Sequence, residues 1–208
     1  MNTKIFTPIE DKDFIYKKLN SKFYSFVFGV SSNNEVRKHL NELKKKYSNA
    51  SHICYAYRLF DGFTLLDDIN ISEYSNDAGE PRGSAGPPIL KILKRQKVIN
   101  AVIFVVRYFG GKKLGIPGLI EAYSESSKGL INKDNLKLWF PVRNIVLEYP
   151  YNIENSLNIL FKNFDVVIKK QEFKTSILSI IELNQFHFDN FTNELSNFPS
   201  CTMKKTKI

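Results

Sequence analysis

The chain has 208 residues, of which 43% are hydrophobic and 25% are charged, a composition that excludes a disordered or fibrous protein and allows one large or two small domains. Its longest apolar run, residues 101–106, has the length of a strand and falls far short of the roughly 20 residues of a membrane span. The net charge of +9 favours an anionic partner, although abundant lysine also fits the background of an AT-rich genome.

The first half of the chain is expected to alternate strands with helices. Aromatic and β-branched residues predict a strand over 23–30, and a helix over 32–47 follows with its apolar residues on one face and Ser32 as its cap. The remaining predicted elements are a strand at 53–60, a helix at 89–97, a buried strand at 101–108 and a helix at 118–132. This alternation predicts a layered structure of sheet and helices.

The order of predicted elements changes after residue 142. The pattern indicates strands at 144–149, 166–173, 176–183 and 201–208, with helices at 152–164 and 187–198. This β-α-β-β-α-β order is typical of the ferredoxin-like arrangement. The run 132–139 is the expected boundary, so we predict an α+β protein with domains at 1–138 and 139–208.

Two glycine-rich loops lie between these elements in the first domain. They are NDAGEPRGSAGPP at 76–88 and RYFGGKKLGIPG at 107–118, and they hold seven of the ten glycines. Glycine permits positive φ and close approach of another surface to the backbone. Each loop ends in proline where a helix is expected to begin, so both helices could aim free N–H groups at one anionic ligand.

Seven short strings within and just after these loops carry a family resemblance: Asn-Asp (76–77), Gly-Glu-Pro (79–81), Ser-Ala-Gly (84–86), RYFGG (107–111), Lys-Leu-Gly (113–115), Gly-Leu (118–119) and Ala-Tyr-Ser (122–124). Together with SKF (21–23) and SHICYAYR (51–58) upstream, they resemble the signature of the YigZ/IMPACT family, in its bacterial YigZ-type form. The resemblance is strong over about residues 20–130 and weaker over the rest.

This resemblance implies a fold for each domain and a role in translation. The first domain is expected to be a ribosomal-protein-like, two-layer domain with helices on one sheet face. The second is expected to resemble the terminal domain of an elongation factor. In the eukaryotic branch the resemblance implies translational control through a regulator of an initiation-factor kinase, a partner that a bacterial-type chain need not share.

Three loop positions depart from the family pattern. Ala78 stands where a second acidic residue is common, Arg82 where a small polar residue is usual, and Pro87 where a basic residue is usual. An acidic pair could hold a metal or act as a general base. Its loss at Ala78 therefore weakens any transfer of catalytic chemistry to this chain.

Known catalytic motifs fit the sequence poorly. The string GGKKLG lacks the first glycine and the Ser or Thr of a phosphate-binding P-loop, and Arg82 stands where a GxSxG nucleophile motif needs glycine. Cys54 and His52 share a strand face without a third orienting group, so packing is the better interpretation of the cysteine. The three histidines are scattered, and we expect no catalytic residue, metal or cofactor.

The loops are then best interpreted as a recognition surface. Its candidate binding residues are His52, Asp77, Glu80, Ser84, Arg107, Tyr108, Lys113 and Tyr123. A shared pocket requires Glu80, Arg107 and Lys113 to converge. The alternative is that the acidic residues and Arg107 pair with each other while the glycines only permit sharp turns.

Lysines near the C-terminus supply a second candidate surface. Lys169, Lys170, Lys204 and Lys205 fall on predicted strands, where a sheet face could contact RNA. The alternative is a solvated edge that resists aggregation.

Together these features predict a non-enzymatic protein that acts in the regulation of translation by binding RNA, the ribosome or a translation-associated protein. No membrane contact and no DNA sequence specificity are expected. The N-terminus has no apolar signal region, which predicts a cytoplasmic protein with reduced cysteines. The alternative function is a small-molecule or nucleotide-binding enzyme with its site at the two loops.

Overall fold

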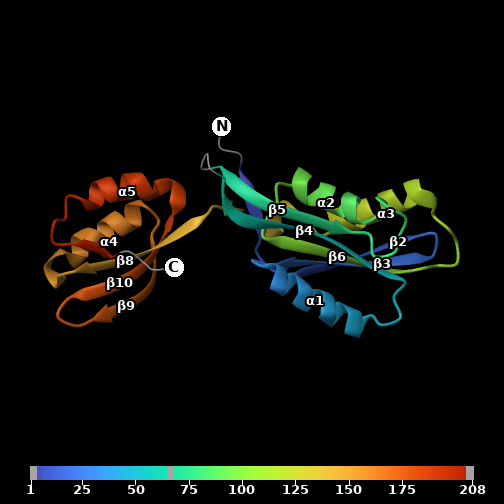
Figure 1. Ribbon diagram of the computed structural model, residues 1–208, viewed down its shortest axis with the longest axis horizontal. Helices are drawn as coiled ribbons and strands as arrows, with labels where there is room; N and C mark the ends of the chain where they lie inside the picture. The colour runs from blue at the N-terminus through green and yellow to red at the C-terminus, as the bar shows by residue number, and fades with distance from the viewer. Residues whose placement is uncertain (1–3, 65–67, 205–208) are drawn as a thin grey trace. The chain divides into compact units, whose positions relative to one another are not determined.

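The computed structural model describes residues 4–64 and 68–204. The chain divides into two compact units, Met1–Trp139 and Phe140–Ile208. Both units combine helices with antiparallel sheets, which confirms the α+β class and the two-domain layout (Figure 1). Within the described residues, no helix is both long and apolar enough to cross a membrane.

The first unit is built on a five-stranded antiparallel sheet in the order β2-β3-β6-β4-β5. Its strands are β2 (Lys12–Lys18), β3 (Ser21–Gly29), β4 (His52–Phe63), β5 (Ile69–Asn76) and β6 (Ala101–Tyr108), while β1 (Ile5–Pro8) pairs separately with β7 (Leu136–Trp139). The central strand β6 is buried from Ala101 to Arg107, as its unbroken apolar run predicts. Antiparallel pairing places Phe23 and His52 on either side of Arg107.

Helices cover both faces of this sheet. They are α1 (Asn33–Lys46), α2 (Gly86–Arg95) and α3 (Gly115–Lys128). Figure 1 shows α2 and α3 on one side of the sheet and α1 on the other. Alternate residues of β6 point to opposite faces: Ile103 and Val105 pack with α2 and α3, whereas Val102 and Phe104 pack with α1. The expectation that the helices share one face was therefore wrong for α1, because β6 carries apolar residues toward both sides.

The helix starts follow their capping residues. Ser32 caps α1 as predicted, and its hydroxyl accepts a hydrogen bond from the Glu35 N–H at 3.3 Å. Both α2 and α3 begin three residues before the predicted positions, at Gly86 and Gly115. The prolines that were expected to precede these helices lie instead in their first turns, where no N–H is needed.

The second unit has the predicted ferredoxin-like order. Its elements are β8 (Val142–Tyr149), α4 (Glu154–Asn163), β9 (Val167–Phe173), β10 (Ile177–Asn184), α5 (Phe188–Leu195) and β11 (Thr202–Lys204), and the antiparallel sheet runs β11-β8-β10-β9. Both helices lie on one face and bury Leu157 and Phe191 against Leu147 and Ile181 (Figure 1). Among the described residues of this unit, no helix covers the other sheet face.

Four short or edge strands were not predicted: β1, β2, β5 and β7. The described part of the chain also contains the 3-10 helices η1 (Lys133–Asn135), η2 (Tyr151–Ile153) and η3 (Gln185–His187). The run expected as the domain boundary, 132–139, forms η1 and β7, and β7 pairs with β1. The run therefore belongs to the first unit, and the division follows Trp139.

Candidate functional site

A buried ion pair joins the two glycine-rich loops. The Arg107 Nη1 donates to Glu80 Oε1 at 2.6 Å, and the two residues are only 5% and 8% exposed. Arg107 comes from the end of β6, and Glu80 comes from the loop between β5 and α2. The alternative interpretation of the loops, a direct acid–arginine pair, therefore holds for Glu80.

Aromatic rings enclose the Arg107 side chain. Its guanidinium carbon lies 5.7 Å from the centre of the Phe23 ring and 5.6 Å from that of Phe109. Such stacking suits the planar, weakly hydrated guanidinium. Among the described residues, Arg107 Nε is the only buried side-chain nitrogen or oxygen without a hydrogen-bond partner.

Tyr123 of α3 fixes the carboxylate from the other side. Its hydroxyl donates to the same Glu80 Oε1 at 2.8 Å, and the Cys54 thiol lies 3.3 Å from that hydroxyl. Burial raises the pKa of Cys54 to about 12, and burial also raises the pKa of Tyr123. Both groups therefore hold their protons at neutral pH, so the cysteine is a packing residue as the sequence indicated.

Asp77 organises the first loop through the backbone. One carboxylate oxygen accepts from the Ala85 and Gly86 N–H groups at 2.9 and 2.8 Å, and the other accepts from Gly83 at 2.8 Å. This internal anion occupies the start of α2, where a negative charge is stabilised by the helix dipole. The expectation that α2 offers free N–H groups to a ligand was therefore wrong.

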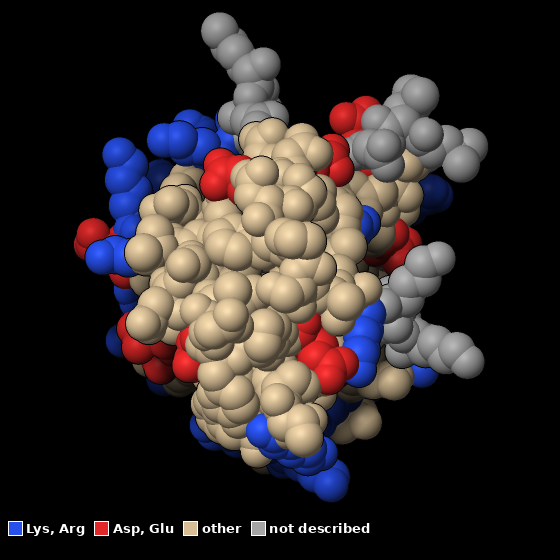
Figure 2. Space-filling model, turned by 90° about the vertical axis from the view of Figure 1, so that its left-hand side faces the viewer, with Lys and Arg blue, Asp and Glu red and all other residues tan. Residues whose placement is uncertain are grey.

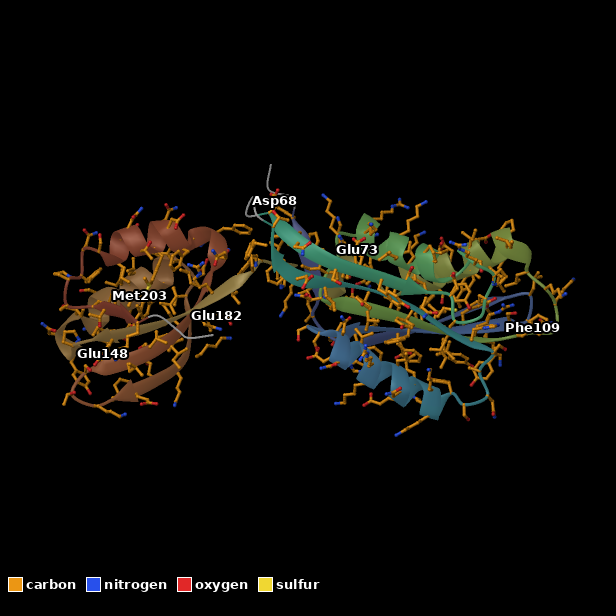
Figure 3. The ribbon with its side chains drawn as sticks, in the orientation of Figure 1. Asp68, Glu73, Phe109, Glu148, Glu182 and Met203 are labelled. Atoms are coloured by element: carbon orange, nitrogen blue, oxygen red, sulfur yellow. The ribbon has the colours of Figure 1, made fainter. Side chains whose placement is uncertain are left out.

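The second loop forms one wall of a pocket of about 280 Å³. Its lining residues are Glu80, Pro81, Arg107, Phe109, Lys113, Leu114, Gly115, Ile116 and Leu119. The pocket lies at the start of α3, whose first turn has no side-chain cap. Figure 3 shows Phe109 at this end of the sheet. Half of the surface of Phe109 is exposed. Glu80, Arg107 and Lys113 thus meet around one pocket with apolar walls.

Of the other candidate binding residues, His52 and Ser84 contact the backbone of the first loop, and Tyr108 lies on the opposite face of the sheet. His52 contacts the Ala78 carbonyl through Nδ1 at 2.9 Å, and the buried Ser84 hydroxyl donates to the Pro81 carbonyl at 2.6 Å. Both contacts shape the first loop. Tyr108 follows Arg107 on β6 and therefore points to the opposite sheet face, where its ring meets Tyr24 edge-on.

Ala78, one of the three departures from the family pattern, sits on the exposed outside of the first loop. Its φ of +47° is left-handed, and its N–H donates to the Asn76 side chain at 2.7 Å. An acidic residue at this position would therefore extend from the exposed side of the loop, whereas Glu80 is buried. Among the described residues, no three His, Cys, Asp or Glu side chains come together to hold a metal ion.

Four lysines on or beside the sheet of the second unit pair with glutamates. Lys169 pairs with Glu182 at 3.0 Å, and Lys204 pairs with Glu148. Lys170 and Lys174 share the carboxylate of Glu172; Lys205 lies outside the described residues. Figure 3 places Glu148 and Glu182 along this sheet, and Figure 2, which views the second unit end-on, shows mostly uncharged residues over the middle.

Together, the fold and these contacts define a two-domain α+β protein with a loop-built pocket in its first domain. The profile of the Impact N-terminal domain matches residues 19–131, which is more than half of the chain. The chain belongs to the IMPACT family, and the predicted resemblance is confirmed.

Two bacterial relatives and one solved structure illustrate the likeness. IMPACT family member YvyE of Bacillus subtilis is 39% identical over 111 residues, which is 53% of this chain and 48% of that protein. The chain therefore spans about half the length of YvyE. IMPACT family member YigZ of Escherichia coli is 24% identical over 178 residues, which is 86% of this chain and 85% of YigZ. A crystal structure of a hypothetical protein shares the fold, with a TM-score of 0.63, 20% identity and coverage of 100% of this chain and 99% of that one.

Proposed function

We propose that this protein regulates translation in the cytoplasm as a non-enzymatic binding protein that contacts RNA on the ribosome. Membership of the IMPACT family supports a role in the regulation of translation. The main support for an anionic partner is the distribution of charge along the chain. Residues 1–139 contain 22 basic and 14 acidic residues, whereas residues 140–208 contain eight and seven.

This distribution favours the first unit as the contact surface. Almost all of the net positive charge belongs to it, and α1 ends with three exposed lysines, Lys44, Lys45 and Lys46. In the second unit, by contrast, Lys169, Lys170 and Lys204 pair with glutamates on the same sheet. A polyanion would have to displace those carboxylates before it gained the lysine charges, so the C-terminal lysines are the weaker candidates.

The loop contacts support binding in preference to turnover. The Glu80 carboxylate already accepts from Arg107 and Tyr123, and the Cys54 thiol is buried with a raised pKa. A nucleophile or general base needs a group that is free to exchange a proton near neutral pH. These groups instead hold the two loops in one shape.

The first prediction is salt-dependent binding to ribosomes through α1. Each neutralised phosphate releases counterions, so three contacts imply a loss of affinity of about 20- to 40-fold between about 50 and 200 mM salt. We expect Lys44→Gln/Lys45→Gln/Lys46→Gln to weaken binding and to flatten this salt dependence. The measurement is co-sedimentation of the full chain with purified ribosomes at both salt concentrations.

The matched control neutralises the same number of lysines in the second unit. Lys169→Gln/Lys170→Gln/Lys204→Gln is expected to leave ribosome affinity within about twofold of the parent, because these lysines are paired with glutamates and lie outside the proposed contact surface. A stronger effect in this variant than in the α1 variant would contradict the proposed surface. Absence of ribosome binding at low salt would contradict the function itself.

The loop pocket favours a second candidate, binding of a small anionic ligand as in a nucleotide-binding enzyme. Its supporting observation is the unpaired Arg107 Nε beside a pocket that Lys113 also lines. A stabilising thermal shift with a nucleotide or pyrophosphate, lost in Lys113→Ala, would favour this candidate over the ribosome contact.

A further inference from the structure

A second pocket lies on the other side of the first unit, between α1 and the edge of the sheet. It has a volume of about 270 Å³ and is lined by Asn33, Val36, Arg37, Tyr55, Tyr57 and Tyr74. Pockets for drug-sized ligands measure roughly 300–1,000 Å³, so this one suits a single small ring system. Three of its six lining residues are tyrosines.

Strand pairing brings these tyrosines together. Tyr55 and Tyr57 lie two residues apart on β4, so they share a face, and Tyr57 is directly opposite Tyr74 on β5. The Tyr74 ring is stacked on Tyr57, with centroids 5.6 Å apart and an angle of 25°, and its centroid is 5.8 Å from that of Tyr55. Because β5 is an edge strand, 44% of Tyr74 remains exposed.

The polar groups of this pocket suit a nucleobase joined to a phosphate. Among the described residues, Arg37 is the only charged one that lines it, and the Asn33 amide can both donate to and accept from a base edge. Burial raises the pKa of Tyr55 and of Tyr57, so both phenols are neutral at physiological pH. The carboxylate of Glu73, the neighbour of Tyr74, points to the other sheet face, where it pairs with Arg58 and Lys94.

From these contacts we propose that the tyrosine pocket (Tyr55, Tyr57 and Tyr74 with Arg37 and Asn33) binds an unpaired base of single-stranded RNA. The exposed Tyr74 ring would stack on the base, and Arg37 would contact the adjoining phosphate. Stacking of splayed bases on aromatic side chains is the usual way in which proteins bind single-stranded RNA. Arg37 lies on α1, the helix whose last turn carries Lys44, Lys45 and Lys46. This inference rests on the proposed function and adds a site and a ligand to it.

Tyr74→Leu tests the proposal, because it removes the ring at an exposed position and keeps an apolar side chain. The probes are a short single-stranded polyuridine RNA and an RNA duplex of the same length, titrated into the full chain by fluorescence anisotropy. Loss of one stacked base lowers affinity roughly five- to a hundredfold, so we expect that loss for the single strand and unchanged duplex affinity. Tyr74→Phe keeps the ring and should bind like the parent.

Tyr151→Leu is the matched control, since Tyr151 is an exposed tyrosine of the second unit. It should alter neither affinity. Unchanged single-strand binding in Tyr74→Leu would overturn the tyrosine pocket and leave the β5 edge as a site for an extended peptide. If the protein binds the duplex and ribosomes but Tyr74 has no effect on single-strand binding, this inference is wrong and the proposed function stands. If it binds none of the three, both are wrong.

Discussion

Glu80→Ala is expected to lower the free energy of unfolding of the first unit by about 3–5 kcal/mol, the usual cost of removing one partner from a buried ion pair. Arg107 is only 5% exposed, and its guanidinium would lose the Glu80 carboxylate that accepts its hydrogen bond. Tyr123 would lose the same acceptor. Urea unfolding followed by the fluorescence of Trp139 measures this loss, because the only tryptophan lies in the first unit, against Phe60.

Two variants separate this effect from a general loss of charge. Glu121→Ala breaks the Lys18–Glu121 pair, whose glutamate side chain is 62% exposed, and should cost no more than about 1 kcal/mol. Glu80→Leu combined with Arg107→Met removes both buried charges and should recover much of the stability lost in Glu80→Ala. Equal small losses for Glu80→Ala and Glu121→Ala would show that the buried pair does not hold the loops together.

Gly110→Ala is expected to destabilise the first unit by about 3 kcal/mol or more, at the upper end of the cost of overpacking. A Cβ at Gly110 would collide with the backbone of Asn20 and Ser21, at the turn between β2 and β3. The Gly110 N–H also donates to the Ser21 hydroxyl at 3.2 Å. The second glycine-rich loop therefore lies against that turn, and backbone cannot move aside as a side chain can.

Gly111→Ala is the control for this prediction. A Cβ there would meet nothing within 4 Å, but the φ of +82° is left-handed, so the expected cost is only about 1–2 kcal/mol. Urea unfolding monitored by Trp139 applies again. A larger loss for Gly111→Ala than for Gly110→Ala would mean that backbone conformation, and not the close approach to the β2–β3 turn, explains the glycine pair.

The parts of the fold that could be predicted are those with an unambiguous period. The apolar run of β6 predicted a buried strand there, and the helical spacing of α1 predicted a helix with nearly the observed bounds. The observed order of elements in the second unit is also the predicted β-α-β-β-α-β order. The sequence of β5 is polar because it is an edge strand, so it did not stand out from the loop that follows. That omission also hid the tyrosine pocket, which exists only because Tyr74 pairs across strands with Tyr57.

Some of the residues that line the loop pocket could be singled out from the sequence, but their arrangement could not. Glycine spacing pointed to the loops, and Glu80, Arg107 and Lys113 do line one pocket. Sequence proximity grouped Tyr108 with Arg107, although strand alternation sends neighbours to opposite faces. The three backbone hydrogen bonds of Asp77 depend on the path of the loop, and no local pattern indicates them.

The pairing of the C-terminal lysines with glutamates could not be predicted from the sequence either. Lys204 and Glu148 are far apart along the chain and meet because β11 pairs with β8. Lys169 and Glu182 meet in the same way, across β9 and β10. Counting lysines along the sequence therefore overestimated the positive charge that this sheet offers to RNA.

Ultraviolet crosslinking of the full chain on purified ribosomes tests the central claim most directly, because it reports which residues touch RNA. After nuclease digestion, mass spectrometry locates the peptides that carry a nucleotide. We predict crosslinks in the first unit, foremost in the peptides that contain Tyr55, Tyr57 and Tyr74 and in the last turn of α1. Crosslinks confined to β9 and β11 of the second unit, or a ribosome-bound protein without RNA crosslinks, would contradict an RNA contact through the first unit.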